Sequence, residues 1–407
     1  MRLPVFPLVI DVYLNGNPMT QTLSQFSFAT APRIQFGCGV LGSLVDVAGG
    51  LVGGKCLIVT DKGLIATGIV AQAEEALRSG GVEVALFSDV EADPSVATVL
   101  AAVAQAQAMG AASIIGLGGG SSLDVAKLVA YLSIGDEKIE DIYGVGQATG
   151  VRLPLILIPT TSGTGSEVTP IAIVTTASHE KMGVVAPVLL PDLALLDPDL
   201  TVGLSAPITA ATGIDAMVHA IEAYASASAN NNPMSRTLAL EALRLLGASL
   251  LAGVKDGSNI AARSDLMLGS MLAGQAFANS PVAAVHALAY PIGGHFKIPH
   301  GLSNALVLPY VLRFNAVTSA DAYADTAIAA FPDLAVLSKS ERALAFCDAL
   351  ADLALKCGLP PRLRDVDIGQ DSLALLARDA IKQTRLLVNN PRPLTEADIL
   401  QIYEDAW

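Results

Sequence analysis

Apolar residues in the first half of the chain follow two alternating patterns. Short continuous runs rich in Val, Ile and Leu occur at residues 55–61, 83–89 and 112–120, which is typical of strands buried on both faces. Alanine-rich segments at 69–81 and 95–111 separate these runs and carry apolar residues at helical spacing. Strands that alternate with helices predict an α/β fold with a parallel sheet covered on both faces.

The pattern changes near residue 203. From Ile208 onward almost nothing resembles a strand, and the apolar residues follow the helical period. Helices are expected at 213–227, 235–254, 261–278, 341–358 and 372–387. We therefore expect an α/β dinucleotide-type domain over residues 1–203 and an all-helical domain over residues 204–407.

Charge and cysteine content exclude several classes of function. The 407 residues include 24 Lys and Arg against 38 Asp and Glu, a net charge of −14, with no basic run. Such a chain repels a phosphate backbone, so we expect no nucleic-acid partner. Its four cysteines form no CxxC pair, which favours reduced thiols and a cytoplasmic protein.

The sequence also gives no reason to expect a membrane partner. No uninterrupted apolar run approaches the roughly 20 residues that span a bilayer. The N-terminal stretch 1–19 has the apolar character of a signal peptide, but two prolines and Asp11 interrupt it and no small-residue cleavage site is evident. We interpret it as a leader to the first strand, with Met1 or Met19 as the start.

A glycine-rich loop follows the predicted strand at 112–116, in "GLGGGSSLDVAK". Gly118, Gly119 and Gly120 allow a ligand to approach the backbone closely. Ser121 and Ser122 open a helix, whose first amides suit an anion such as a pyrophosphate. Taken alone, this loop fits a tight turn equally well.

A second loop, in "LILIPTTSGTGSE", also follows a buried strand. Thr160, Thr161, Thr164 and Ser166 offer hydroxyl groups that suit a ribose, a phosphate or a carboxamide. An ordinary polar loop is the alternative. Two such loops, each at the carboxyl end of a strand, favour a dinucleotide.

Asp61 lies just past the strand at 55–60. An acid at this place accepts hydrogen bonds from the adenosine ribose and repels a 2′-phosphate, which favours NAD(H) over NADP(H). A solvated aspartate in a turn with Lys62 and Gly63 is the alternative.

Candidate metal ligands lie in the second half. In "GIDAMVHAIEAY", Asp215 and His219 are four residues apart and share one face of a helix. Taken alone, the pair is better explained without a metal, with Asp215 as an acid near a helix N-terminus and His219 as a hydrogen-bonded core histidine. The chain has five histidines, and "VHALAYPIGGHFKIPHG" holds three of them; His286 and His300 complete a set of one carboxylate and three imidazoles that suits Fe²⁺ or Zn²⁺.

These motifs, in this order, resemble the iron-dependent alcohol dehydrogenase family of the dehydroquinate synthase-like superfamily, from about Phe26 to the end of the chain. The resemblance implies a dinucleotide-binding α/β domain, a helical domain, an active site in the cleft between them, and a homodimer or higher homo-oligomer. It implies metal ligands at Asp215, His219, His286 and His300, and cofactor contacts at Asp61, at 118–122 and at 160–166. It also places Lys181 near the nicotinamide.

One position departs from many relatives. Where they carry a histidine that handles protons, four residues after His286, this chain has Tyr290. A phenol donates hydrogen bonds but is a poor base, with a reference pKa of roughly 10. A catalytic Tyr290 and a merely packed aromatic ring therefore both remain possible. His295 is off the ligand pattern, and we expect it to line the cleft, and His179 to lie in a surface loop.

The resulting hypothesis is reversible hydride transfer between a small alcohol or aldehyde and NAD(H), with the metal as Lewis acid. The alternatives are a maleylacetate reductase-like or hydroxyacid-oxoacid-type oxidoreductase, a dehydroquinate synthase-like lyase, and a non-catalytic metal- or nucleotide-binding protein. Phosphorylated or dicarboxylate substrates need basic side chains, and the poverty of basic residues near the metal motifs counts against them.

Overall fold

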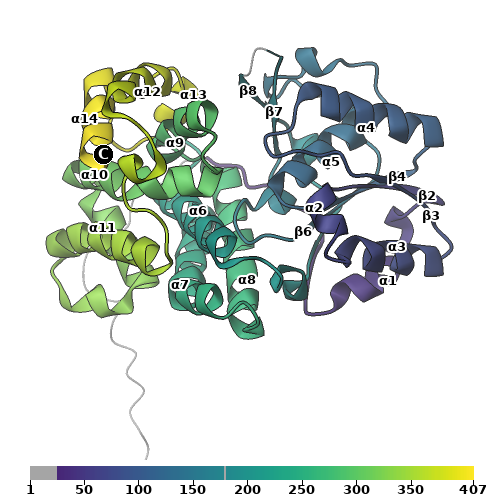
Figure 1. Cartoon of the computed structure of the whole chain (residues 1–407), viewed down its shortest axis with the longest axis horizontal. Helices are drawn as coiled ribbons and strands as arrows, with labels where there is room; N and C mark the ends of the chain where they lie inside the picture. The colour runs from purple at the N-terminus through teal and green to yellow at the C-terminus, as the bar shows by residue number, and fades with distance from the viewer. Residues whose placement is uncertain (1–24, 178–179) are drawn as a thin grey trace, which may run out of the picture.

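The protein is described from a computed structural model that covers residues 25–177 and 180–407. The N-terminal stretch 1–19, with both candidate starts, and His179 lie outside the described residues. Two parts lie side by side (Figure 1): a strand-containing part in purple to blue and a helical part in teal to yellow. The expected fold class, a parallel α/β domain followed by helices, is confirmed.

A six-stranded parallel sheet is the framework of the first part. In spatial order its strands are β1 (Ile34–Phe36), β9 (Leu193–Leu196), β6 (Leu155–Pro159), β4 (Ser113–Gly118), β2 (Lys55–Val59) and β3 (Glu83–Phe87). Each neighbouring pair is parallel. The expected strands are present as β2, β3, β4 and β6. Sequence analysis missed β1 and β9, since three or four residues carry too short a pattern.

Helices cover both faces of this sheet. They are α1 (Leu44–Ala48), α2 (Lys62–Ile65), α3 (Ile69–Ser79), α4 (Val96–Met109) and α5 (Gly120–Leu132). Alternate side chains of β2 point to opposite faces: Leu57 and Val59 pack with α4 and α5, whereas Cys56 and Ile58 pack with α1 and α3. Burial on both faces is the reason why these strands are continuous apolar runs.

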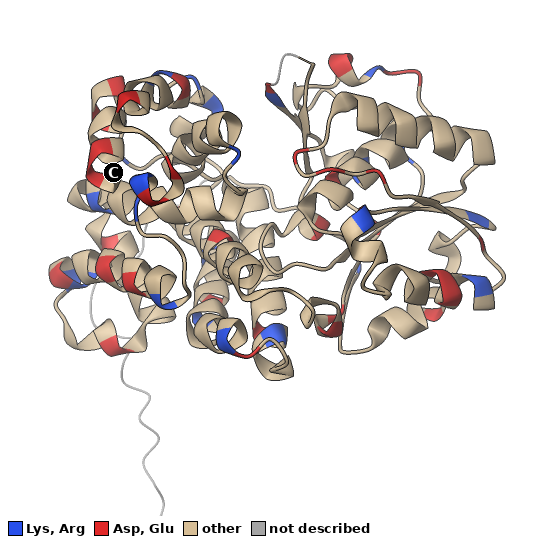
Figure 2. Cartoon of the chain, in the orientation of Figure 1, with Lys and Arg blue, Asp and Glu red and all other residues tan. Residues whose placement is uncertain are grey.

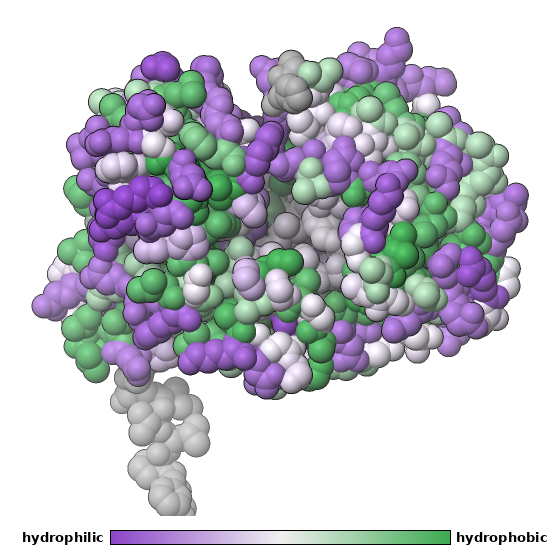
Figure 3. Space-filling view, viewed as in Figure 1, coloured by the Kyte–Doolittle hydropathy of each residue, from purple (hydrophilic) through white to green (hydrophobic). Residues whose placement is uncertain are grey.

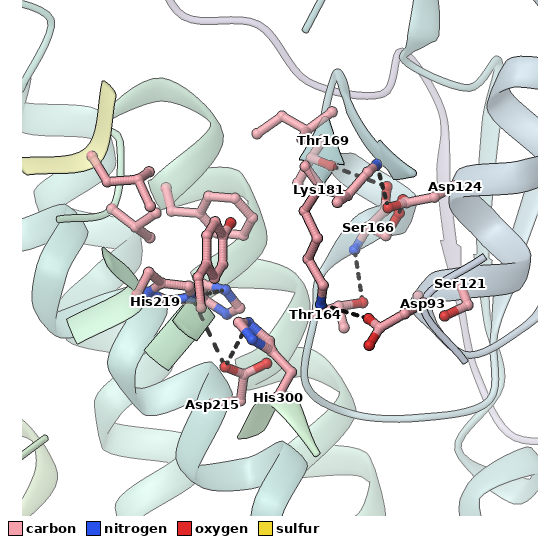
Figure 4. A pocket seen from close by; sticks show the side chains of 18 of the residues that line it. Asp93, Ser121, Asp124, Thr164, Ser166, Thr169, Lys181, Asp215, His219 and His300 are labelled. Atoms are coloured by element: carbon pink, nitrogen blue, oxygen red, sulfur yellow. Dashed lines mark hydrogen bonds and ion pairs between the residues drawn. The ribbon is translucent and has the colours of Figure 1, made fainter. Parts of the chain in front are cut away.

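A second, three-stranded sheet lies at the edge of the first part that faces the helices. It consists of β5 (Gly144–Val145), β8 (Lys181–Val185) and β7 (Ile171–Thr175), with β7 and β8 antiparallel. Sequence analysis did not predict it. The sheet places Lys181 above the cleft between the two parts (Figure 4).

The second part contains no strand after Leu196 in the portion of the chain that the structure describes. Its helices are α6 (Ala206–Ala225), α7 (Pro233–Lys255), α8 (Ile260–Asn279), α9 (Ala284–Phe296), α10 (His300–Ala330), α11 (Lys339–Lys356), α12 (Leu373–Ala380), α13 (Thr384–Leu387) and α14 (Glu396–Ala406). The single helix expected over 372–387 is wrong, because the chain breaks at 381–383 and restarts as α13. Residue 203 lies between β9 and α6, and the domain boundary there stays a prediction.

Among the described residues, α7 alone has the length and apolar composition of a membrane span. Its Leu243, Leu246 and Leu250 are buried in the core shared with α6 and α8. Burial of apolar side chains within the helical part therefore accounts for its composition. Charged residues of both signs are scattered along both parts (Figure 2).

Candidate functional site

A cavity of about 250 Å³ lies where the two parts meet. Figure 3 shows the surface hollowed between them, and Figure 4 shows side chains from both parts pointing into this space. Of the predicted residues, its walls include Gly120, Ser121, Thr164, Ser166 and Lys181 from the first part, and Asp215, His219, His286, Tyr290 and His300 from the second. We call this space the central cavity.

The structure brings the four predicted metal ligands together. Asp215 and His219 lie one turn apart on α6, His286 lies on α9, and His300 is the first residue of α10. The ligand atoms of Asp215, His219 and His286 all lie within 4.8 Å of one another. His300 joins them, since its Nε2 atom is 3.6 Å from Oδ1 of Asp215.

Hydrogen bonds fix which nitrogen of each buried imidazole faces this cluster. His219 Nδ1 lies 3.2 Å from the carbonyl oxygen of Gly163, so it carries the proton that this acceptor requires. His286 Nδ1 lies 2.7 Å from Oε2 of Glu222 and is likewise the donor. The two Nε2 atoms, 3.0 Å apart, therefore direct lone pairs toward each other.

Burial favours the neutral form of His219 and His300. It lowers the pKa of His219 to about 3 and also lowers the pKa of His300, despite the opposing charge of Asp215. Burial acts to raise the pKa of the Asp215 carboxyl, but His300, His219 and His286 together hold it below its usual value. Near neutral pH the cluster thus offers neutral imidazoles at His219 and His300 beside the Asp215 carboxylate.

This donor set fits a divalent metal. Two nitrogen lone pairs and a carboxylate oxygen that converge in a buried space repel one another unless a cation lies between them. Nitrogen and oxygen ligands without cysteine suit Fe²⁺ or Zn²⁺.

Sequence analysis missed two residues that support the cluster. Glu222 accepts from the backbone N–H of Val285 through Oε1 (2.6 Å) and from His286 through Oε2. Asn304 donates to Oδ1 of Asp215 at 2.6 Å. The spacing Asp215, His219, Glu222 places all three on one helix face, a signal that the sequence did contain; Asn304 follows His300 by four residues and carries a similar signal.

The two predicted cofactor loops face each other at the carboxyl ends of β4 and β6. A methyl group built on Gly119 would lie 3.7 Å from the Thr161 side chain, and one on Gly120 would lie 2.8 Å from Thr164. Gly119 caps α5 without a side-chain hydrogen bond to the first amides, whereas a serine or an asparagine caps α4, α7 and α8. The N-terminus of α5 thus keeps amides available for an anion.

The other predicted residues of these loops do not line the central cavity. Ser122 and Thr160 are buried, and Gly118 ends β4 at a φ of 151°. Asp61 accepts from the backbone N–H of Leu64 through Oδ1 at 2.9 Å, so it caps α2. Its Oδ2 atom lies near Gly118, 3.5 Å from a methyl group built there, so a capping role and a ribose contact are compatible.

Lys181 forms an ion pair with Asp93, whose Oδ1 atom lies 2.6 Å from the lysine Nζ atom (Figure 4). Asp93 has a positive φ of 55°. Both side chains line the central cavity. The charge of Lys181 is therefore already compensated within the chain.

A buried polar network, which sequence analysis missed, anchors the second loop. Lys127 on α5 is fully buried and donates to Ser166 Oγ at 2.7 Å, to Thr169 Oγ1 and to the carbonyl of Ile171. Ser166 in turn donates to Asp124 at 2.6 Å. The hydroxyl of Ser166 is therefore occupied inside the protein, and its predicted cofactor contact stays a prediction.

Tyr290 lies beside the metal cluster, with its ring centroid 5.9 Å from that of His300. Burial raises the pKa of the phenol, and the nearby Arg385 guanidinium only partly opposes the rise. Arg385 lies on α13 and lines the cavity, so a distant segment brings a basic side chain to metal motifs that are themselves poor in basic residues. The expectation that His295 lines the cleft is also wrong, because its ring bonds Asp379 at 2.7 Å outside the cavity.

Comparison with known proteins gives consistent results over almost the whole chain. The sequence profile described as iron-containing alcohol dehydrogenase matches residues 31–198, and that of the Fe-containing alcohol dehydrogenase family, C-terminal, matches residues 209–407. Long-chain-alcohol dehydrogenase 1 of Geobacillus thermodenitrificans is 42% identical over 92% of this chain and 95% of its own length.

Solved structures that resemble this chain give the same result as the sequence comparisons. A 1,3-propanediol oxidoreductase superposes with a TM-score of 0.91 at 33% identity, over 94% of this chain and all of the other. Sulfoacetaldehyde reductase from Bifidobacterium kashiwanohense in complex with NAD⁺ superposes with a TM-score of 0.84 at 28% identity, over 94% of this chain and 98% of the other.

Proposed function

The chain belongs to the iron-containing alcohol dehydrogenase family, and from this premise we propose that its central cavity is the active site of NAD(H)-linked alcohol oxidation and aldehyde reduction. The family establishes the reaction class: reversible, metal-dependent hydride transfer between an alcohol and the nicotinamide. The assignment of individual residues is our proposal. Its main support is the convergence of the His219 and His286 lone pairs beside Asp215.

We assign the metal to Asp215, His219, His286 and His300. The neutral state of His219 and His300 and the ionised state of Asp215 meet the requirement that metal ligands be deprotonated. When bound, an Fe²⁺ or Zn²⁺ ion supplies Lewis acidity toward the substrate oxygen, and NAD(H) carries the hydride. Glu222 keeps His286 in the tautomer that offers Nε2 to the cluster.

The first part is proposed to hold the cofactor across the cavity from this cluster. The uncapped N-terminus of α5, with Gly118, Gly119, Gly120, Ser121 and Ser122, suits the pyrophosphate. The facing hydroxyl loop contributes Thr160, Thr161, Thr164 and Ser166. Asp61 is placed to accept from the adenosine ribose, and Lys181 points into the space that the nicotinamide end would occupy.

Apolar side chains and Tyr290 complete the pocket around the reacting atoms. Phe277 stacks on His219 with ring centroids 4.3 Å apart, and Val282 and Leu386 add further apolar wall. These side chains restrict water beside the metal ligands. With its raised pKa, the Tyr290 phenol stays protonated at neutral pH and acts as a hydrogen-bond donor rather than a base.

The finer assignments follow from the same premise. We propose that residues 1–203 and 204–407 form two domains, a division supported by the separate profile matches at 31–198 and 209–407. We also propose a cytoplasmic homodimer or higher homo-oligomer. Small alcohols and aldehydes are the proposed substrates, without a nucleic-acid or membrane partner.

Metal removal tests the proposed reaction. The protein is stripped with a chelator, the metal content is measured, and NADH absorbance is followed with short aldehydes before and after Fe²⁺ or Zn²⁺ is restored. We expect activity to disappear with the metal and to return with at least one of the two ions. Full activity in protein shown to be metal-free would contradict the proposal.

A further inference from the structure

We propose that Arg385 determines substrate specificity by binding an anionic group, a carboxylate or a sulfonate, at the far end of a short aliphatic aldehyde or alcohol. The inference rests on the proposed function of the central cavity and adds the chemical class of its substrate. It is carried by the position, the charge and the surroundings of a single side chain.

The position of Arg385 follows from the break in the chain at 381–383. α13 begins after this break and presents Arg385 and Leu386 to the cavity. The guanidinium lies beside the Tyr290 phenol, and the ring of Tyr290 lies next to that of His300. The guanidinium and the predicted metal ligand His300 are therefore both neighbours of the Tyr290 ring.

Arg385, which is exposed to solvent, is the basic side chain of the described cavity wall that lacks an ion-pair partner. Two basic side chains line the described cavity, and Lys181 is paired with Asp93. The lining acids are engaged as well: Asp124 with Lys127, and Asp215 with the imidazoles. Arg385 has no ion-pair partner within residues 25–177 and 180–407. Its planar fork matches a carboxylate or a sulfonate through two parallel hydrogen bonds.

The space between the two ends of this site suits a short hydrocarbon chain. Phe277, Val282 and Leu386 line the same cavity and offer no charged group. An oxygen at the metal ligands and an anion at Arg385 would place the methylene groups of a substrate against these side chains. The cavity thus fits a bifunctional substrate with a polar group at each end.

Kinetics with matched probes test the inference on the Fe²⁺-loaded full chain with NADH. The probes are 4-oxobutanoate (a carboxylate), 2-oxoethanesulfonate (a sulfonate) and neutral butanal. Arg385→Gln is expected to lower the ratio of kcat/KM for the better anionic probe to that for butanal at least tenfold, or about 1.4 kcal/mol, mainly through KM. Arg385→Lys should recover part of this ratio. Arg378→Gln, which removes an exposed arginine of α12 outside the cavity, is the matched control and should leave it unchanged.

Binding without turnover separates this inference from the proposed function. In the presence of NADH, 4-hydroxybutanoate and butan-1-ol cannot be oxidised, so calorimetry reports their affinity alone. We expect Arg385→Gln to weaken 4-hydroxybutanoate at least tenfold more than butan-1-ol. If the wild type binds the anion through Arg385 but reduces no aldehyde, the proposed function fails and this inference stands. Equal losses for charged and neutral probes, or no loss, would overturn the inference.

Discussion

Replacing Glu222 by glutamine tests whether the tautomer of His286 controls metal binding. The carboxylate uses both oxygens, one for the N–H of Val285 at 2.6 Å and one for His286 Nδ1 at 2.7 Å. A glutamine amide has a single acceptor oxygen. In one orientation its NH₂ group faces the Val285 N–H, which leaves a buried donor unpaired. In the other it faces His286, which then gains by moving its proton to Nε2 and withdrawing that lone pair from the metal cluster.

Either outcome is expected to weaken metal binding. An unpaired buried donor costs about 1–3 kcal/mol, and a tenfold change in affinity corresponds to about 1.4 kcal/mol. Loss of a hydrogen-bond partner behind a metal-bound histidine typically lowers metal affinity or activity about 10–100-fold. We therefore expect Glu222→Gln to raise the dissociation constant for Fe²⁺ or Zn²⁺ by at least tenfold.

The assay is an anaerobic competition titration with a chromophoric chelator, read with circular dichroism to verify the fold. Glu241→Gln is the matched control, because Glu241 is an exposed glutamate of α7 paired with Arg244 at the surface. A folded Glu222→Gln protein that binds metal within threefold of the wild type would refute the reasoning about the His286 tautomer.

Three further substitutions test the cofactor site, the Tyr290 phenol and one buried acid. Asp61→Ala should raise the kcat/KM ratio of NADPH to NADH at least tenfold, measured with both cofactors, because it removes the charge that repels a 2′-phosphate. Tyr290→Phe should lower kcat/KM but keep the shape of its pH profile between pH 6 and 9, because the raised pKa of the phenol keeps it protonated. If the rise or the fall of kcat/KM with pH disappeared in this variant, the phenol would titrate in that range and the prediction would be wrong. Burial raises the pKa of Glu167 from 4.5 to about 7, so the stability that its neutral form contributes is lost as pH rises through about 7. Glu167→Gln should therefore gain stability over the wild type between pH 5 and 8, by up to ~3 kcal/mol in thermal unfolding; a constant difference would contradict it.

Local periodicity explains how much of the fold the sequence predicts. The strands β2, β3, β4 and β6 are apolar runs because they are buried on both faces, and each burial pattern can be recognised within a few residues. β1, β9 and the β7–β8 hairpin escaped prediction because their pairing, not their own pattern, makes them strands. The break between α12 and α13 was hidden by apolar residues that keep the helical period across it.

The residues of the candidate site likewise fall into those that a local sequence pattern predicts and those that depend on tertiary packing. The spacing of Asp215 and His219 fixes a shared helix face, and the family resemblance supplied His286 and His300, so these four residues were predictable from the sequence alone. Glu222 was also within reach, since it lies on that same face. Its bond to His286, however, depends on how α9 packs against α6, which no spacing within either helix specifies.

What only the tertiary structure decided is which distant side chains share the cavity and which charges remain uncompensated there. The sequence shows that Lys181 and Arg385 are basic, but not that Asp93 pairs with Lys181, whereas Arg385 has no ion-pair partner in the described part of the chain. Periodicity is a property of neighbouring residues, whereas electrostatic pairing depends on distances between segments that only folding brings together. The sequence thus determined the fold class and the reaction class and predicted the metal ligands, and the packing of α13 against the cleft decided which basic side chain lines the cavity without an ion-pair partner in the described part of the chain.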